Sequence, residues 1–209
     1  MILHAKNLGK RYNHEWIFRN LNYTFNPGVY AVLGPNGSGK STLLQVLWGQ
    51  LPASTGSLTY SSGESTIPIE DIHQRLVMAT PYMELIEEFT LQELLKFHFS
   101  FKKIRGAYSI ENLMDLMELS HAKNKQISLF SSGMKQRLKL ALAFFSDVEA
   151  VFLDEPTSNL DKKAIDWYWE HFNQLPPETL IFIGSNLEIE CPANATPIHL
   201  LEYKRVTSQ

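Results

Sequence analysis

The sequence predicts an α/β protein with a mainly parallel sheet and a helical insert. Apolar strand-like runs at 150–153 and 180–183 flank an aromatic-rich helix candidate at 162–172. The order strand, helix, strand is typical of a parallel sheet. Between 89 and 145 the apolar residues recur instead at helical spacing. These patterns predict an α/β core that is interrupted by a mostly helical segment.

The N-terminal part is predicted to contain short strands and turns. Residues 2–5 and 21–25 have strand-like patterns, and a turn at 26–28 precedes a third apolar run at 29–33. Residues 54–70 are rich in Ser, Thr, Gly and Pro, which predicts a hairpin and loop.

The composition is that of an ordinary globular protein. The 209 residues can form one substantial core. Hydrophobic residues make up 44% and charged residues 20% of the chain, which excludes an intrinsically disordered protein. Because the net charge is only −3, there is no electrostatic footprint for nucleic acid, and we expect no nucleic-acid partner.

Cysteine usage and the length of the apolar runs predict a cytoplasmic chain. The single cysteine, Cys191, cannot form an intrachain disulfide, which fits a reducing compartment. The longest apolar run, at 140–145, is too short to cross a bilayer, and the N-terminus lacks the pattern of a signal peptide. We therefore expect any membrane attachment to be made through a partner.

A glycine-rich segment that ends in Lys-Ser follows the apolar run at 29–33 directly. It consists of Gly34, Pro35, Asn36, Gly37, Ser38, Gly39, Lys40 and Ser41. The segment matches the phosphate-binding pattern G-x-x-x-x-G-K-[ST] completely, and its position between a strand-like and a helix-like segment argues against chance. The glycines let the backbone curl so that its N–H groups point at phosphate oxygens. The sequence therefore predicts a site for a nucleoside triphosphate.

Two side chains and a helix complete the expected phosphate site. Lys40 supplies a positive charge for the β- and γ-phosphates, and the Ser41 hydroxyl can ligate Mg²⁺. A helix predicted over 41–48 would direct its N-terminal dipole at the same anion, which adds Thr42 to the candidate residues.

Two adjacent carboxylates, Asp154 and Glu155, follow the apolar run at 150–153. The carboxyl edge of a parallel sheet is where such proteins bind ligands. Asp154 is therefore a candidate for holding Mg²⁺ through water, and Glu155 for orienting or deprotonating the attacking water.

A further motif lies between the phosphate loop and the carboxylates. It contains Leu129, Phe130, Ser131, Ser132, Gly133, Met134, Lys135, Gln136 and Arg137. This run resembles the signature segment of the ATP-binding-cassette (ABC) ATPases, usually written L-S-G-G-Q. The segment 158–161, Ser-Asn-Leu-Asp, is similar to that family's D-loop, and Tyr12 stands where the family has an aromatic residue that stacks on adenine. The motifs follow the family's order from Tyr12 to about Asn186.

The resemblance implies a fold and a division of the chain. It implies a P-loop NTPase core, an N-terminal antiparallel β subdomain and a helical insert, which together form one ABC nucleotide-binding domain over 1–209. The ATPase core with its β subdomain would comprise 1–80 and 146–209, and the helical subdomain 81–145.

The resemblance also implies a mechanism that one chain cannot complete. In this family two ATP-binding domains pack head to tail, so that the phosphate loop of one and the signature helix of the other enclose each ATP. Lys40 and Glu155 of this chain would then act with Ser131, Ser132 and Gly133 of a second subunit. ATP would hold the two subunits together, and hydrolysis would release them.

Three of these residues also have plainer explanations. Ser131 could act only as the N-cap of the helix that follows it, and Asp161 could cap a helix that begins near Lys162. Tyr12 could be an ordinary tyrosine of the surface or the core.

Two positions depart from the family's pattern. The glutamine that ligates Mg²⁺ and senses the permease is absent, and Pro81 or Tyr82 occupies its place. Nearby Glu84 could supply an oxygen ligand or belong to a solvated acidic loop. Asn186 replaces the switch histidine, and because an amide carries no charge at any pH, we expect slow hydrolysis.

The resemblance implies the ATP-binding subunit of a membrane transporter whose permease is a separate chain. The subunit would lie in the cytoplasm, peripheral on the inner face of the membrane. The apolar segment 81–101 corresponds to the place where the family docks a permease helix, although most of its apolar residues would suit a core equally well. The alternative is a soluble assembly factor or clamp, a class that often has coiled-coil insertions, paired cassettes or basic surfaces. The cargo and the direction of transport would depend on the partner.

Overall fold

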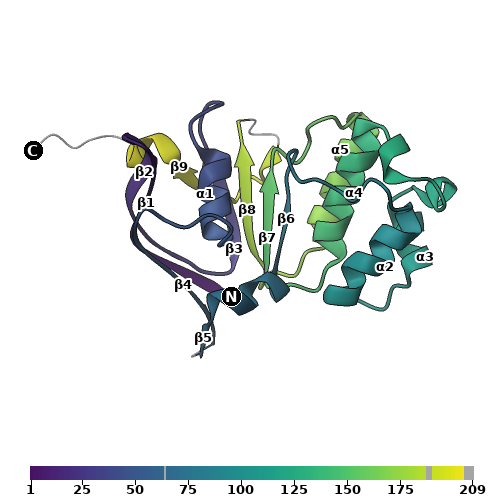
Figure 1. Ribbon diagram of the computed structural model, residues 1–209, viewed down its shortest axis with the longest axis horizontal. Coiled ribbons are helices and arrows are strands. Elements are labelled where there is room, and N and C mark those ends of the chain that lie inside the picture. The colour runs from purple at the N-terminus through teal and green to yellow at the C-terminus, as the bar shows by residue number, and fades with distance from the viewer. Residues whose placement is uncertain (64, 187–189, 205–209) are drawn as a thin grey trace, which may run out of the picture. The chain divides into compact units, whose positions relative to one another are not determined.

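The computed structural model describes residues 1–63, 65–186 and 190–204, which form two compact units (Figure 1). The first unit comprises Met1–Met78, Glu149–Glu155 and the C-terminal part from Pro177 onward. The second unit comprises Ala79–Val148 and Pro156–Pro176. The α/β class predicted from the sequence is confirmed.

An antiparallel sheet in the strand order β2-β1-β4-β5 forms one layer of the first unit. Its strands are β1 (Ile2–Tyr12), β2 (Glu15–Phe25), β4 (Thr55–Ser62) and β5 (Ser65–Ile67). Asn13, in the tight turn between β1 and β2, has a φ of 52°, a left-handed conformation that asparagine tolerates well. The strands predicted at 2–5 and 21–25 lie inside β1 and β2, and the hairpin predicted within 54–70 is formed by β4 and β5.

A second sheet has the strand order β6-β7-β8-β3-β9. Its strands are β3 (Gly28–Leu33), β6 (Leu76–Ala79), β7 (Ala150–Asp154), β8 (Leu180–Ser185) and β9 (Thr196–His199). The pairs β7–β8, β8–β3 and β3–β9 are all parallel. The apolar runs that sequence patterning assigned to a parallel sheet are therefore neighbours, and their carboxyl ends share one edge.

Helix α1 (Lys40–Leu47) lies between the two sheets and contacts β1, β7 and β8 (Figure 1). Leu43 and Leu44 on this helix are fully buried in the same apolar core as Phe152 and Phe182, whose rings stack with centroids 4.9 Å apart. Because α1 packs against strands of both sheets, the end of the preceding loop that joins α1 is held in place.

The second unit is mostly helical. Its helices are α2 (Leu91–Phe101), α3 (Ile110–Leu116), α4 (Ser132–Phe145) and α5 (Lys162–Phe172). Short 3-10 helices cover Ile69–Gln74 and Leu200–Tyr203 in the first unit, and Ser120–Ala122 and Ile127–Leu129 in the second. Capping boxes start α2 at Thr90 and α3 at Ser109. In each box the side chain of the cap residue accepts a hydrogen bond from the backbone N–H of the residue three positions later, and the side chain of that residue accepts one from the backbone N–H of the cap residue. No helix among the described residues is both long and apolar enough to span a membrane.

Helix α5 packs with the helical unit, whereas the division predicted from the sequence assigned it to the ATPase core. The Trp167 indole donates a hydrogen bond to the carbonyl of Leu116 over 2.7 Å, and the Arg137 guanidinium lies 5.5 Å from the centroid of the Trp167 ring. Phe144 and Tyr168 pack between α4 and α5 with ring centroids 5.7 Å apart. The aromatic face of α5 is thus part of this unit's core, which the strand-helix-strand pattern could not indicate.

Candidate nucleotide-binding site

The glycine-rich loop joins the carboxyl end of β3 to α1, and its backbone requires glycine. Gly37 and Gly39 have φ values of 75° and 105°, in the left-handed region. A Cβ on Gly39 would lie 2.1 Å from Cγ2 of Ile17, and one on Gly34 would lie 2.5 Å from Oγ of Ser38. The curled shape of the loop therefore depends on close contacts that a side chain at Gly34 or Gly39 would prevent.

Lys40 is folded into this loop. Its side chain is 5% exposed, and Nζ donates to the carbonyls of Gly34 at 2.9 Å and Pro35 at 3.2 Å. A buried ammonium whose hydrogen bonds within the described residues go to neutral carbonyls is well placed to receive an anion. The loop thus presents a positive charge in its centre.

The N-terminus of α1 has no side-chain cap. Gly39 occupies the N-cap position, and no acidic residue lies in the first turn. The first N–H groups of a helix have no acceptor within the helix, so those of Lys40, Ser41 and Thr42 can bind an anion. These are the groups for which the sequence predicted phosphate binding.

Asp154 ends β7, and the residue is only 2% exposed. Burial raises the pKa of this carboxyl group, while a hydrogen bond from Ser41 and the charge of Lys40 oppose that shift. Oδ1 has no hydrogen-bond partner among the described residues. An unpartnered carboxylate oxygen beside a serine hydroxyl is a donor set that suits a hard divalent cation such as Mg²⁺, so these residues fit the predicted metal.

Glu155 has an uncommon backbone conformation. Its φ of 45° lies in the left-handed region, which is uncommon for a residue other than glycine, asparagine or aspartate. Its N–H donates to the carbonyl of Gly184 at 2.8 Å, a bond between the ends of β7 and β8. This bond fixes the point on the sheet edge from which the Glu155 side chain projects.

Asn186, directly after β8, contacts the glycine-rich loop. Its Nδ2 donates to Oδ1 of Asn36 over 3.1 Å. The loop, the two carboxylates and Asn186 thus lie along one edge of the parallel sheet, as expected from the topology.

Glu190 is a buried carboxylate that sequence patterning did not indicate. It is nearly inaccessible to solvent and accepts a hydrogen bond from Oγ of Ser185. Its negative charge, like that of Glu155, raises the pKa of Asp154. No local motif marks this position, because its burial depends on tertiary packing alone.

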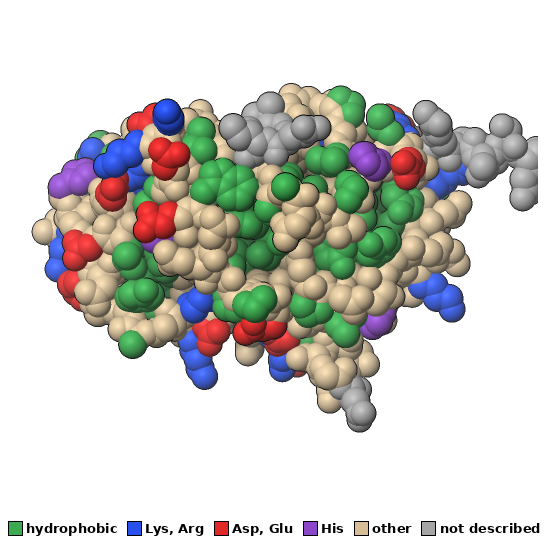
Figure 2. Space-filling model, turned by 180° about the vertical axis from the view of Figure 1, so that it is seen from behind, with side chains coloured by type: hydrophobic (Ala, Val, Ile, Leu, Met, Phe, Trp, Pro, Cys, Tyr) green, Lys and Arg blue, Asp and Glu red, His purple; other side chains and the backbone are tan. Residues whose placement is uncertain are grey.

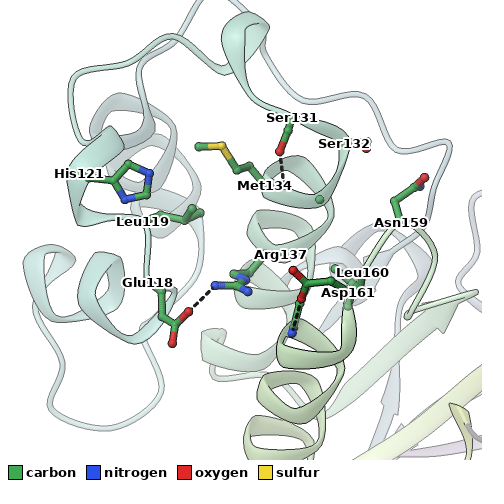
Figure 3. A pocket seen from close by; sticks show the side chains of 12 residues that line it. Glu118, Leu119, His121, Ser131, Ser132, Met134, Arg137, Asn159, Leu160 and Asp161 are labelled. Carbon is green, nitrogen blue, oxygen red and sulfur yellow. Dashed lines mark hydrogen bonds and ion pairs between the residues drawn. The ribbon is translucent and has the colours of Figure 1, made fainter.

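The signature-like segment lines a separate hollow of about 380 Å³ in the helical unit (Figure 3). Ser131, Ser132 and Gly133 lie at the start of α4, opposite the D-loop-like residues Asn159 and Asp161. A Cβ on Gly133 would lie 3.2 Å from the carbonyl oxygen of Asn159, so glycine allows the close approach.

Two residues that line this hollow, Ser131 and Asp161, do cap the helices that follow them. Ser131 Oγ accepts a hydrogen bond from the Met134 N–H at 3.2 Å, and the Asp161 carboxylate accepts one from the Ala164 N–H at 2.8 Å. A capped helix start still directs N–H groups toward a ligand, so capping and anion binding are compatible. Glu118, bonded to Arg137 at 2.8 Å and Lys163 at 2.9 Å, adds a charged wall.

Tyr12 lies at the turn end of β1 and is 47% exposed, which excludes the core alternative. The Lys10 ammonium lies 5.3 Å from the centroid of its ring. Stacking on a nucleobase stays a prediction for this residue.

The segment that replaces the family's glutamine borders another hollow, of about 590 Å³. Tyr82 is exposed, and Pro81, Glu84 and Lys139 lie in the wall. Lys139 on α4 is buried and donates to the carbonyls of Thr80 at 3.1 Å and Pro81 at 2.8 Å. Sequence patterning did not identify this lysine, which ties the segment to the signature helix.

Replacing Asp154 with asparagine is expected to stabilise the nucleotide-free protein at pH 7 by about 1 kcal/mol, or roughly 2–4 °C in Tm. Because the pKa of Asp154 is raised in the folded chain, its carboxylate destabilises the fold once the pH exceeds the ordinary value for aspartate. The advantage of Asp154→Asn should therefore shrink as the pH falls through the raised pKa toward the ordinary value for aspartate, and should vanish below that ordinary value. Melting curves between pH 3.5 and 8 measure this effect, and a lower Tm for the variant at pH 7 would contradict it.

Comparison with known proteins gives consistent matches. The profile of a family described as ABC transporter matches residues 18–158. The chain is 32% identical over 165 residues to the uncharacterized ABC transporter ATP-binding protein YybJ of Bacillus subtilis (strain 168), covering 78% of this chain and 75% of that protein. It is 30% identical over 174 residues to the Nod factor export ATP-binding protein I of Burkholderia lata, which covers 81% of this chain but only 57% of that longer protein.

The fold also matches solved structures. One is an ATP-binding cassette in a dimeric post-hydrolysis state, bound to ADP and Pi. It superposes with a TM-score of 0.75 at 22% identity and covers 90% of this chain and 89% of that one.

Proposed function

Since the chain belongs to the ABC transporter family, we propose that it is an ATP-binding and ATP-hydrolysing subunit that powers a separate membrane permease. The proposal rests on one observation above the others. The buried ammonium of Lys40 and the hydrogen bond from Ser41 to Asp154 lie in the same unit, at the edge where β3 and β7 end. A cation and a metal-binding pair at that edge suit a nucleoside triphosphate with its Mg²⁺.

Each residue of this edge takes a separate task. Lys40 and the N–H groups of the loop bind the β- and γ-phosphates of ATP. Ser41 and Asp154 hold Mg²⁺, which neutralises charge on the phosphates. Glu155 orients the attacking water, and Asn186 donates a hydrogen bond to the γ-phosphate.

The active unit in this proposal is a head-to-tail homodimer. Ser131, Ser132 and Gly133 of one copy complete the ATP site formed by the phosphate loop of the other. The dimeric ATP-binding cassette with a similar fold supports this arrangement. Residues 1–209 act as a single nucleotide-binding domain in which Tyr12 stacks on the adenine.

The partner in the membrane is a permease that binds the helical unit, which holds the chain at the inner face of the membrane. Phe97 and Phe101 on α2 support this proposal, because both are exposed and their rings pack together with centroids 5.2 Å apart. Figure 2 shows basic and acidic side chains interspersed among the described residues of one face.

Purification from detergent-solubilised membranes tests the transporter function. We expect the tagged chain to retain an integral membrane protein, and Phe97→Ser with Phe101→Ser to lose it without losing MgATP binding. Leu201→Ser, which removes an exposed apolar side chain of the other unit, is the matched control. Recovery with soluble proteins alone would favour the assembly-factor class.

Asn186 is expected to limit the chemical step. An imidazolium would stabilise developing charge on the γ-phosphate better than a neutral amide, and about 1.4 kcal/mol in the barrier is tenfold in rate. Asn186→His should therefore accelerate single-turnover hydrolysis by about tenfold, mainly below pH 7 where the imidazole is charged, and Asn186→Ala should slow it. Unchanged rates in both variants across pH would exclude this role.

A further inference from the structure

Lys10 is a buried lysine close to the end of β1. The residue is 8% exposed, although it lies only two positions before the exposed Tyr12. Its Nζ donates a hydrogen bond to the carbonyl of Pro52 at 2.8 Å, and it forms no ion pair with any described residue. Because burying an ammonium without a carboxylate costs free energy, a further source of stabilisation is needed.

The ring of Tyr12 supplies this stabilisation. Lys10 and Tyr12 are two positions apart on β1, and side chains at that spacing lie on the same face of a strand. The Lys10 ammonium lies over the ring, 5.3 Å from its centroid. This is within the range of about 6 Å in which the negative face of an aromatic ring attracts a cation. The ring therefore contacts a cation, while 47% of the tyrosine stays accessible to solvent.

The loop between α1 and β4 holds the ammonium in place. Pro52, which accepts the hydrogen bond from Lys10, belongs to this loop. The same loop is bonded to β1 on both sides of Lys10. The Ser54 N–H donates to the carbonyl of Gly9 at 2.7 Å, and the Ser54 Oγ accepts a hydrogen bond from the Arg11 N–H at 3.1 Å. The position of the ammonium is thus fixed before any ligand arrives.

The next residue along the strand, Arg11, has a different aromatic partner. Arg11 is exposed, and its guanidinium carbon lies 5.6 Å from the centroid of the Trp16 ring. Two adjacent cations of β1 therefore contact different rings. Arg11 consequently provides a control for Lys10 with the same charge and nearly the same position in the chain.

We propose that Lys10 is a positioning residue for the nucleobase of ATP, because its ammonium holds the Tyr12 ring in the orientation in which the ring stacks on adenine. This inference rests on the proposed function, in which Tyr12 stacks on adenine. Fixing a tyrosine ring before the ligand arrives removes part of the entropy cost of binding. Lys10 acts through the ring, so it strengthens the binding of the base and leaves the binding of the phosphates unchanged.

Calorimetric titrations of the full chain with MgATP and with magnesium tripolyphosphate, which lacks the nucleoside, test this role. Lys10→Met should weaken MgATP binding by about three- to tenfold and leave tripolyphosphate binding within about twofold. Arg11→Met, which removes an equal charge from the next residue, should leave both affinities unchanged. In a Tyr12→Leu chain, which should already bind MgATP more weakly, Lys10→Met should have no further effect.

Lys10→Arg keeps a cation that stacks on aromatic rings, and it is the second variant if Lys10→Met folds poorly. It should bind MgATP within about twofold of the unaltered chain, and a folded Lys10→Arg chain as weak as Tyr12→Leu would overturn the proposal.

Two further results would overturn the inference alone. Equal weakening of MgATP and tripolyphosphate by Lys10→Met would mean that the lysine acts on the phosphates. An undiminished effect of Lys10→Met in the Tyr12→Leu chain would mean that it does not act through the ring. Absence of MgATP binding to the unaltered chain would overturn the proposed function and this inference together.

Discussion

Replacing Lys40 with alanine is expected to weaken binding of MgATP by about 3 kcal/mol, which is more than a hundredfold in Kd. The ammonium is buried and is already held between the carbonyls of Gly34 and Pro35. Its attraction to phosphate therefore needs little reorganisation, and removing it loses a charge-assisted contact in a preorganised site. Isothermal titration calorimetry at fixed ionic strength measures the difference directly.

An exposed lysine of the same unit provides the control. Lys6→Ala makes the same change in net charge on the antiparallel sheet and should leave the Kd within about twofold. Wild-type affinity in a folded Lys40→Ala protein would mean that the phosphates bind elsewhere. Equal weakening in both variants would point to net charge as the cause.

Glu155→Gln is expected to keep MgATP binding and to reduce hydrolysis by about 10²- to 10⁴-fold, the range for removing a positioned general base. Glutamine has nearly the same shape, so the backbone with φ of 45° and the bond to Gly184 should persist. If ATP joins two copies, the variant should accumulate as an ATP-bound dimer. Size-exclusion chromatography with light scattering reports the dimer, and phosphate release reports the turnover.

The matched control for this variant is Glu70→Gln, since Glu70 is an exposed glutamate in the 3-10 helix of the same unit. It should hydrolyse ATP at the normal rate and stay monomeric. A Glu155→Gln protein with normal turnover would assign the base to another residue. Lost turnover without a dimer would keep the catalytic role but contradict ATP-driven association.

The part of the site that follows from sequence is the part determined by local geometry. The phosphate loop needs glycine at fixed spacings, and Asp154 and Glu155 mark the end of an apolar strand, so both could be predicted from a few consecutive residues. The placement of Asn186 required one more step, because parallel strands end at a common edge.

The rest depends on packing between segments distant in the chain. Lys139 and Glu190 are charged residues whose burial no local pattern indicates. Helix α5 has a strong aromatic face, but the sequence does not say which neighbour covers it. The small cavity lined by Arg105, Phe145 and His171 likewise requires the ends of α4 and α5 to meet one loop.

The close approach of Ile17 to Gly39 changes how the N-terminal strands should be regarded. A methyl group of β2 occupies the space where a Cβ at the loop's last glycine would be, at 2.1 Å. The antiparallel sheet therefore contacts the phosphate loop and limits which residue can stand at its last glycine, in addition to covering the core. A parallel sheet with α1 alone would carry every residue of the motif but would lack this contact. In a scaffold without β2 the contact with Ile17 would be lost, while the φ of 105° would still require glycine at position 39.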